Sequence, residues 1–207
     1  MLIFKNKNKN NFDEKKVKNL FEEQIEFYSS EKTFAHCSLT TYFIEKWLSE
    51  KINEQQNINS PLKICEFGGA GGILLDKIDK LFSNKVSLYN AELVDFYSNY
   101  QTNKNINFVN TSILNSEFQN NSFDIIIIRN VLHHLIGKSY KKTYLNQYKA
   151  ISELFRLVRD EGIIIIEELV NQSLLASKII FYLSKFTSLL RLRIQRFQIT
   201  PYTIVFF

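Results

Sequence analysis

Four of the six glycines in this 207-residue chain fall within five positions, Gly68–Gly72. They follow a short apolar run, Leu62–Phe67, and precede Gly72–Phe82, where apolar residues recur at helical spacing. A turn of small residues between a strand and a helix lets the backbone approach a ligand closely, and the helix N-terminus behind it favours negative charge. This feature predicts an α/β fold with a ligand site at the carboxyl end of its first strand.

Further apolar runs alternate with amphipathic segments along the chain. The isoleucine runs show no polar alternation, which is typical of strands covered on both faces. The pattern therefore predicts an α/β domain with a doubly wound, mostly parallel sheet. The expected strands are Leu62–Phe67, one within Val86–Val94, Ile106–Val109, Phe123–Ile128 and Gly162–Glu167, with a helix over Tyr140–Val158 before the last.

The length suits one domain. We expect a single domain over 1–207, divided into an N-terminal helical cap (1–60), a ligand-binding core (61–170) and a C-terminal part (171–207). Helical spacing places two helices in the cap, at Asp13–Ser30 and Thr33–Lys51.

Charge and composition limit the kinds of binding partner that we expect for this chain. The net charge is +5, but Lys, Asn and Ile are abundant throughout, which suggests an AT-rich gene, so we expect no nucleic-acid partner. No run approaches the ~20 apolar residues of a stable membrane span. Cys37 and Cys65 have no metal-binding spacing, so we expect no metal and a cytoplasmic location.

Three stretches carry a family resemblance. Glu66–Gly72 reads E-x-G-x-A-x-G, Phe123–Leu135 reads "FDIIIIRNVLHHL", and Glu153–Glu168 reads "ELFRLVRDEGIIIIEE". Together with an acidic residue about twenty positions beyond the glycines, they resemble class I S-adenosylmethionine-dependent methyltransferases of the small-molecule, type 11-like group. The resemblance covers about Leu62–Glu168 and implies a Rossmann-like methyltransferase fold with S-adenosyl-L-methionine as cofactor.

The resemblance also implies which residues surround the cofactor. For the ribose we prefer Glu92 to Asp95 because of its spacing. Ser112 stands where the family has an acid for the adenine, and Ala70 replaces a glycine. The implied cofactor-binding residues are Glu66, Gly68, Gly69, Ala70, Gly72, Glu92, Asp95, Ser112 and Asn130.

His133 and His134 follow the fourth strand, near where the reactive methyl group should point. Either is a candidate base for an acceptor that must lose a proton. The alternative is a structural role at the start of a helix. The resemblance further implies an acceptor pocket under the two N-terminal helices, where aromatic residues could equally be core. Its candidate lining residues are Tyr28, Phe34, His36, Tyr42 and Phe43.

We therefore predict methyl transfer to an O, N or C atom of a small-molecule acceptor. The alternative is a catalytically silent, methyltransferase-like binding protein or partner subunit. A nicotinamide oxidoreductase is disfavoured because Ala70 and Ile73 break the G-x-G-x-x-G pattern. The sequence indicates neither the acceptor nor the oligomeric state.

The C-terminal part has several interpretations. Ser173–Leu190 looks helical, and with its lysines and arginines up to Arg196 it suits a substrate cover, a membrane-surface helix or an outer helix of the sheet, the last being expected. Arg191–Ile199 and Tyr202–Phe207 are predicted strands. They either complete the sheet as its final hairpin or belong to a cap, which leaves an exposed sheet edge.

Overall fold

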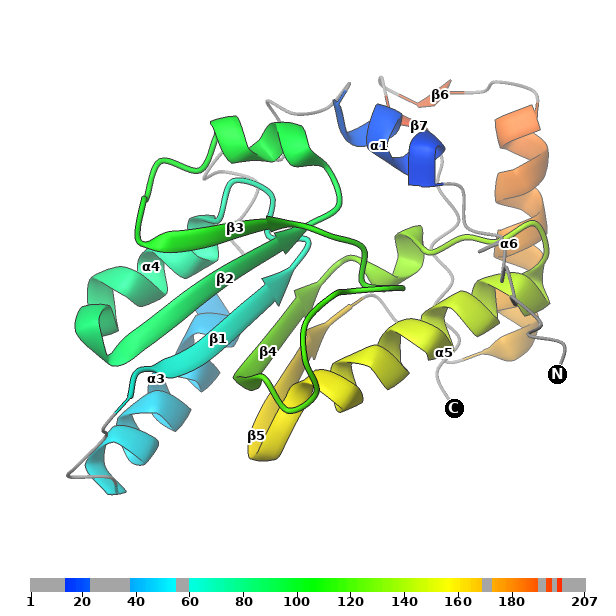
Figure 1. Cartoon of the computed structure of the whole chain (residues 1–207). Helices are drawn as coiled ribbons and strands as arrows, with labels where there is room; N and C mark the ends of the chain where they lie inside the picture. Colours follow the sequence, from blue (N-terminus) through cyan, green and yellow to red (C-terminus); the bar gives the residue numbers. More distant parts are fainter. Residues whose placement is uncertain are drawn as a thin grey trace, which may run out of the picture.

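The computed structural model describes residues 14–22, 38–54, 60–168, 173–189, 193–194 and 197–198. Figure 1 shows a central sheet with helices on both of its faces. The helices are α1 (Glu14–Glu22), α3 (Ser38–Glu54), α4 (Ile73–Phe82), α5 (Tyr140–Leu157) and α6 (Leu174–Leu189), with short turns η2 (Ser83–Lys85), η3 (Asp95–Asn99) and η4 (Leu132–His134). The strands are β1 (Leu62–Phe67), β2 (Val86–Glu92), β3 (Ile106–Asn110), β4 (Phe123–Arg129), β5 (Val158–Glu167), β6 (Arg193–Ile194) and β7 (Phe197–Gln198).

The five long strands form one parallel sheet in the order β3-β2-β1-β4-β5. The order reverses between β1 and β4, so this junction is the switch point where open α/β sheets bind ligands. The predicted doubly wound, parallel sheet is confirmed. β5 begins four residues earlier than predicted, at Val158 rather than Gly162.

One face of the sheet packs against α3 and α4. Ile44 and Leu48 of α3 and Leu74 and Ile78 of α4 are fully buried, and they meet Ile64 and other side chains of the sheet. Alternate strand residues point to opposite faces, so the next residue along each strand belongs to the other core. The whole cluster of buried side chains is Ile44, Leu48, Leu62, Ile64, Leu74, Leu75, Ile78, Val86, Leu88, Ile106, Ile125 and Ile127.

The other face packs against α5, but only Leu154, Ile151 and Val158 of the predicted stripe pack there. We expected Tyr144, Tyr148, Ile151, Leu154, Phe155 and Val158 to face the core. Tyr148 and Phe155 are instead 54% and 68% exposed. The buried stripe is Thr143, Gln147, Ala150, Leu154 and Leu157, which has the same helical spacing but includes polar and small residues. Hydrophobicity alone does not locate the centre of the buried face of α5, because Thr143 and Gln147 are polar residues that form buried hydrogen bonds there.

The two N-terminal helices have different positions. α1 lies near the carboxyl ends of the strands, whereas α3 lies against the sheet face beside α4 (Figure 1). Only α1 has the position of a cap, so the prediction that both helices cover the strand ends is wrong for α3. Tyr42 and Phe43 of α3 are more than half exposed and face away from the core. The rest of the predicted first helix and the start of the second lie outside the described residues.

At the C-terminal end, α6 does not lie along the sheet as the expected outer helix. It stands beyond the N-terminal end of α5 (Figure 1), with Phe181 against Tyr140 at a ring-centroid distance of 5.7 Å. The single strand predicted at Arg191–Ile199 is instead a short antiparallel hairpin, β6 with β7, which forms a sheet of its own. Tyr202–Phe207 lies outside the described residues. Among the described strands, β5 is thus an edge.

Candidate functional site

Side chains of β2 form hydrogen bonds with the backbone of the glycine turn between β1 and α4. Gly68 and Gly72 adopt left-handed φ angles of 73° and 74°, and Ala70 has a φ of 47°. The backbone N–H of Ala70 donates to Glu92 Oε2 at 3.0 Å, and Asn90 Nδ2 donates to the Ala70 carbonyl at 2.9 Å. A left-handed alanine is unfavourable by itself. The two hydrogen bonds compensate, so an alanine is accommodated in this turn.

Buried polar side chains lie directly above the α3/α4 core. Glu66 pairs with Arg129 of β4, with 2.6 Å between Oε1 and Nη2 and side chains only 1% and 7% exposed. Asn90 is the register partner of Glu66 on β2, so the two side chains share a face. Thr40 Oγ1 of α3 donates to Glu167 at the end of β5. We call this set the strand-end polar layer: Thr40, Glu66, Asn90, Glu92, Gln101 and Arg129.

Two oxygens in the strand-end polar layer have no hydrogen-bond partner among the described residues, Glu66 Oε2 and Asn90 Oδ1. Both face Gly69. A Cβ placed on Gly69 would lie 2.6 Å from Asn90 Oδ1 and 2.9 Å from Glu66 Oε2. Unpaired buried acceptors are costly in a folded protein. This pair therefore forms a ready-made site for a hydrogen-bond donor beside the glycine turn.

The structure separates the two acids proposed for the second strand. Glu92 is 6% exposed, and its carboxylate accepts from the N–H groups of Ala70 and Val94, each at 3.0 Å. Burial raises its pKa above the ordinary value, an effect that the backbone donors oppose. Asp95 begins η3 and is exposed. Glu92 thus lies against the glycine turn, whereas Asp95 is exposed.

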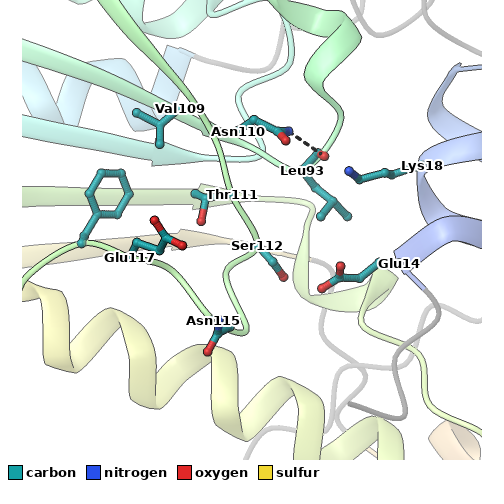
Figure 2. Close-up of a pocket in the computed structure, with 10 residues that line it drawn as sticks. Glu14, Lys18, Leu93, Val109, Asn110, Thr111, Ser112, Asn115 and Glu117 are labelled. Atoms are coloured by element: carbon teal, nitrogen blue, oxygen red, sulfur yellow. Dashed lines mark hydrogen bonds between the residues drawn. The ribbon is translucent and has the colours of Figure 1, made fainter. Parts of the chain in front are cut away.

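Ser112 lies on the wall of a cavity of about 520 Å³ between the end of β3 and α1. Figure 2 shows Glu14 and Lys18 of α1 across from Leu93, Ser112 and Asn115. Ser112 Oγ also accepts from the backbone N–H of Leu114 at 3.3 Å. The cavity has the volume of a small-molecule site. It is lined by Glu14, Lys18, Leu93, Val109, Asn110, Thr111, Ser112, Asn115, Glu117 and Phe118.

The two histidines of η4 have different surroundings. His133 is 4% exposed, and its Nδ1 lies 2.6 Å from Glu168 Oε1 just after β5. The other oxygen of Glu168 accepts from the N–H of Leu132 at 2.8 Å. The pair thus ties η4 to β5. Asn130, just before η4, is exposed with a φ of 53°, and its N–H donates to the Glu167 carbonyl at 2.9 Å.

His134 is half-buried and faces α1. Its ring meets Phe21 edge-on at a centroid distance of 4.8 Å and lies 3.9 Å from the ring of His133. Burial, reinforced by His133, holds the pKa of His134 well below its usual range. His134 is therefore neutral at physiological pH, whereas a carboxylate lies against Nδ1 of His133.

Several residues of the site escaped the sequence analysis. Arg129 lies within a quoted motif and Asn90 within a predicted strand segment, but neither was selected. A charged or amide residue inside an apolar strand is itself a signal of a buried contact. Thr143 and Gln147 hold the loop around η4: Gln147 Nε2 donates to the Leu132 carbonyl at 3.1 Å, and Thr143 Oγ1 accepts from Gly137 N–H at 2.9 Å. No motif indicated these two.

The proposed acceptor-lining aromatics do not converge. Tyr42 and Phe43 are more than half exposed on α3, because α3 buries its other face. Tyr28, Phe34 and His36 lie outside the described residues. Within the described ranges, no three His, Cys, Asp or Glu side chains are placed to hold a metal ion. No described helix is long and apolar enough to cross a membrane.

Comparison with known proteins identifies the central segment. Residues 66–166 match the family model described as "Methyltransferase domain". These residues include the glycine turn, the strand-end polar layer apart from Thr40, the cavity wall of β3 and both histidines of η4. A comparison with curated protein sequences gave no significant match.

Solved methyltransferases share the fold. DszA carbon methyltransferase aligns with a TM-score of 0.52 and 14% identity over 67% of this chain and 37% of its own. A SAM-dependent methyltransferase from Aquifex aeolicus aligns at 0.40 and 18%, over 53% and 57%. Plantazolicin methyltransferase BpumL, solved with SAH, aligns at 0.46 and 18%, over 78% and 62%. The chain thus spans about half the length of such structures.

Proposed function

We propose that the chain is a class I S-adenosylmethionine-dependent methyltransferase that moves the methyl group to an O, N or C atom of a small-molecule acceptor, because residues 66–166 match the methyltransferase-domain family model. The observation that carries the proposal is the pair of unpartnered oxygens beside Gly69, in the turn where this class binds its cofactor. The cofactor supplies an electrophilic methyl group on a sulfonium, so the chain's own tasks are to bind, orient and exclude water.

The donor set fits the cofactor. The ammonium of a methionyl group supplies several hydrogen-bond donors. Glu66 Oε2 and Asn90 Oδ1 are two buried acceptors without a described partner, and the missing side chain of Gly69 leaves the space between them. We therefore assign the methionyl end to Glu66, Asn90 and the turn formed by Gly68, Gly69, Ala70 and Gly72, with Asn130 beside it.

The adenosine end fits the neighbouring strand ends. Glu92 retains acceptor capacity beyond its two backbone bonds, because a carboxylate can accept about four hydrogen bonds, and ribose offers two hydroxyl donors. We assign the ribose to Glu92 and the adenine to the cavity beside Ser112. Glu14 and Lys18 of α1 would then close that cavity from the solvent side (Figure 2).

On the acceptor side, we assign proton removal to His134 and a positioning role to His133. His134 is neutral and faces α1, whereas His133 is held by Glu168. His133 then orients η4, so that a His133 variant disturbs the loop, whereas a His134 variant acts mainly on proton transfer. We further propose a cytoplasmic location, because Cys65 is a free, buried thiol.

Titration calorimetry with S-adenosylhomocysteine tests cofactor binding. Gly69→Ala should weaken binding by more than about tenfold, because its methyl group would collide with Asn90 Oδ1 and Glu66 Oε2. Gly71→Ala is the matched control: its Cβ would meet nothing nearer than the Tyr100 carbonyl oxygen at 3.5 Å, so affinity should not change. If Gly69→Ala fails to fold, Glu92→Ala, which removes the ribose acceptor, should give the same loss.

Two outcomes would contradict the proposal. A folded wild-type protein that does not bind S-adenosylhomocysteine excludes the cofactor assignment. Equal affinities of the Gly69→Ala and Gly71→Ala variants place the ligand away from the turn. A radiolabelled methyl donor, offered with panels of small-molecule acceptors, then separates an enzyme from the alternative. Binding without turnover on any panel favours a catalytically silent, methyltransferase-like binding protein.

A further inference from the structure

One side of α6 is buried and anchors the helix. Phe181 is fully buried against Tyr140 of α5, and Ser177, one turn earlier, is 1% exposed. The opposite side carries large apolar residues that recur at helical spacing. We call these five residues the α6 apolar face; their exposed fractions are Leu175 69%, Ile179 51%, Tyr182 58%, Leu183 58% and Phe186 58%.

Two lysines border the α6 apolar face. By helical periodicity, Lys178 and Lys185 lie on the flank of α6, between its buried side and the α6 apolar face. Lys178 Nζ lies 5.8 Å from the Tyr140 ring centroid. Lys185 Nζ lies 4.9 Å from the Phe181 ring centroid and donates to the Lys138 carbonyl. Both cations are thus held beside the protein body, next to the apolar stripe.

The surrounding charge has one sign. Residues 169–207 contain five Lys and Arg and no Asp or Glu, so they account for the whole excess of 26 basic over 21 acidic residues in the chain. Where α5 meets α6, Lys138, Lys141 and Lys142 are exposed, and the first turn of α5 has no acidic residue. An apolar stripe that is bordered by lysines, on a helix without acidic residues, is complementary to an apolar layer beneath negative charge.

We propose that the α6 apolar face binds the surface of a lipid bilayer that carries anionic headgroups. The helix has 16 residues, too few to span the hydrocarbon, and no described helix qualifies as a span. An amphipathic helix lying in the interface buries its apolar face at the boundary of headgroups and acyl chains, and its lysines remain with the headgroups. The five side chains of the α6 apolar face all find a place in this arrangement.

Vesicle flotation with the full-length protein tests the proposal without any cofactor. Vesicles of three parts phosphatidylcholine to one part phosphatidylglycerol should carry the protein upward at low salt. Pure phosphatidylcholine should bind it at least about tenfold more weakly, and salt should weaken binding to the anionic vesicles. Equal binding to both compositions, or no binding to either, would overturn the proposal.

Two sets of variants locate the contact. Leu175→Asp with Leu183→Asp should reduce vesicle binding by about a hundredfold, because both side chains would have to enter the acyl boundary. Leu81→Asp with Phe155→Asp is the matched control, since these are 54% and 68% exposed on α4 and α5. The control should bind as the wild type does. Equal losses in both double variants would overturn the assignment to α6.

A second copy of the chain is the competing occupant, and its signature differs. In that case sedimentation velocity would show a dimer in the absence of lipid, the Leu175→Asp/Leu183→Asp variant would be monomeric, and neither protein would float with vesicles. This result would overturn the membrane proposal. Charge reversal gives a further test of the surface that binds lipid. Lys178→Glu on α6 should weaken binding to the anionic vesicles more than Lys149→Glu on α5 does.

Discussion

The strand-end polar layer and the α6 apolar face both depart from the usual arrangement of apolar residues inside and polar residues outside, but in different directions. The first buries two glutamates, an arginine, two amides and a threonine at 8% exposure or less. The second leaves five large apolar side chains more than half exposed. Between them, the two isoleucine- and leucine-rich cores of the sheet follow the usual rule.

The difference between the two regions indicates where the chain contacts other molecules. An unpaired buried acceptor is costly in the folded protein, and a long exposed apolar stripe promotes association in water. Each becomes favourable when a suitable molecule binds: a hydrogen-bond donor for Glu66 and Asn90, and an apolar layer for α6. The regions also differ in how they are held, because the polar layer is tied to four strands and α6 is anchored mainly by one phenylalanine.

Breaking the ion pair in the strand-end polar layer should have the largest effect on stability. Arg129→Ala leaves the Glu66 carboxylate buried without its cation, so we expect the free energy of unfolding to fall by about 3–5 kcal/mol. Arg159→Ala is the control, because its pair with Asp124 is 38% and 16% exposed and should contribute under about 1 kcal/mol. Urea unfolding measures both, and equal losses would mean that the layer is not effectively buried.

The anchor of α6 should come next. Phe181→Ala removes the fully buried ring against Tyr140, a change that typically costs about 3–5 kcal/mol where the site cannot collapse. Here we expect a loss of free energy of unfolding at the low end of this range, and one that is confined to α6, because this helix packs at the edge of the domain. Proteolysis within α6 should accelerate, while Phe186→Ala, at 58% exposure, leaves the rate unchanged. Equal proteolysis of the two variants would contradict the anchor.

The accuracy of the sequence analysis differed between these regions for a physical reason. The β1 turn, the parallel sheet and the placement of Glu66 and Glu92 follow from local signals: glycine clustering, uninterrupted apolar runs and motif spacing. The faces of α3 and α5 do not, because Tyr42 and Phe155 are as apolar as the residues that packing buries. Which of two apolar faces turns inward is decided by the partner surface, and that depends on tertiary structure.

Polar positions inside helices were the other gap. Thr143 and Gln147 are buried because they hydrogen-bond the backbone around η4, and nothing in their own sequence neighbourhood indicates that loop. The pairing of His133 with Glu168 likewise joins residues 35 positions apart. Long-range pairs of this kind cannot be found from periodicity. They determine how the histidines are oriented, so the roles of His133 and His134 could not be separated from the sequence.

His134 should give a smaller, pH-dependent effect at the edge of the polar region. Its folded-state pKa lies well below the 6.5 of an unfolded chain, so below about pH 6.5 the unfolded state takes up a proton that the folded state does not. Stability should therefore fall on acidification through this window and be unaffected by His134 above it. His134→Gln should show a shallower decrease in melting temperature between about pH 8 and about pH 5.5.

The wild type and the His134→Gln variant share every other titrating group. The raised pKa of buried Glu92, which has the opposite sign in its pH dependence, therefore cancels in the comparison. Identical pH profiles for the two proteins would show that His134 is protonated as easily in the folded state as in the unfolded one. That result would also remove the reason to prefer His134 over His133 as the proton acceptor.

The smallest effect on stability should come from the α6 apolar face, and its smallness is informative. Leu175→Gln with Leu183→Gln changes two side chains that are 69% and 58% exposed, so the free energy of unfolding should stay within about 0.5 kcal/mol per site. Solubility in lipid-free buffer should nevertheless rise, because the exposed apolar patch shrinks. A loss of several kcal/mol would instead mean that these leucines pack against the chain itself in solution. The α6 apolar face would then be part of a core, and the opposition between the two regions would disappear.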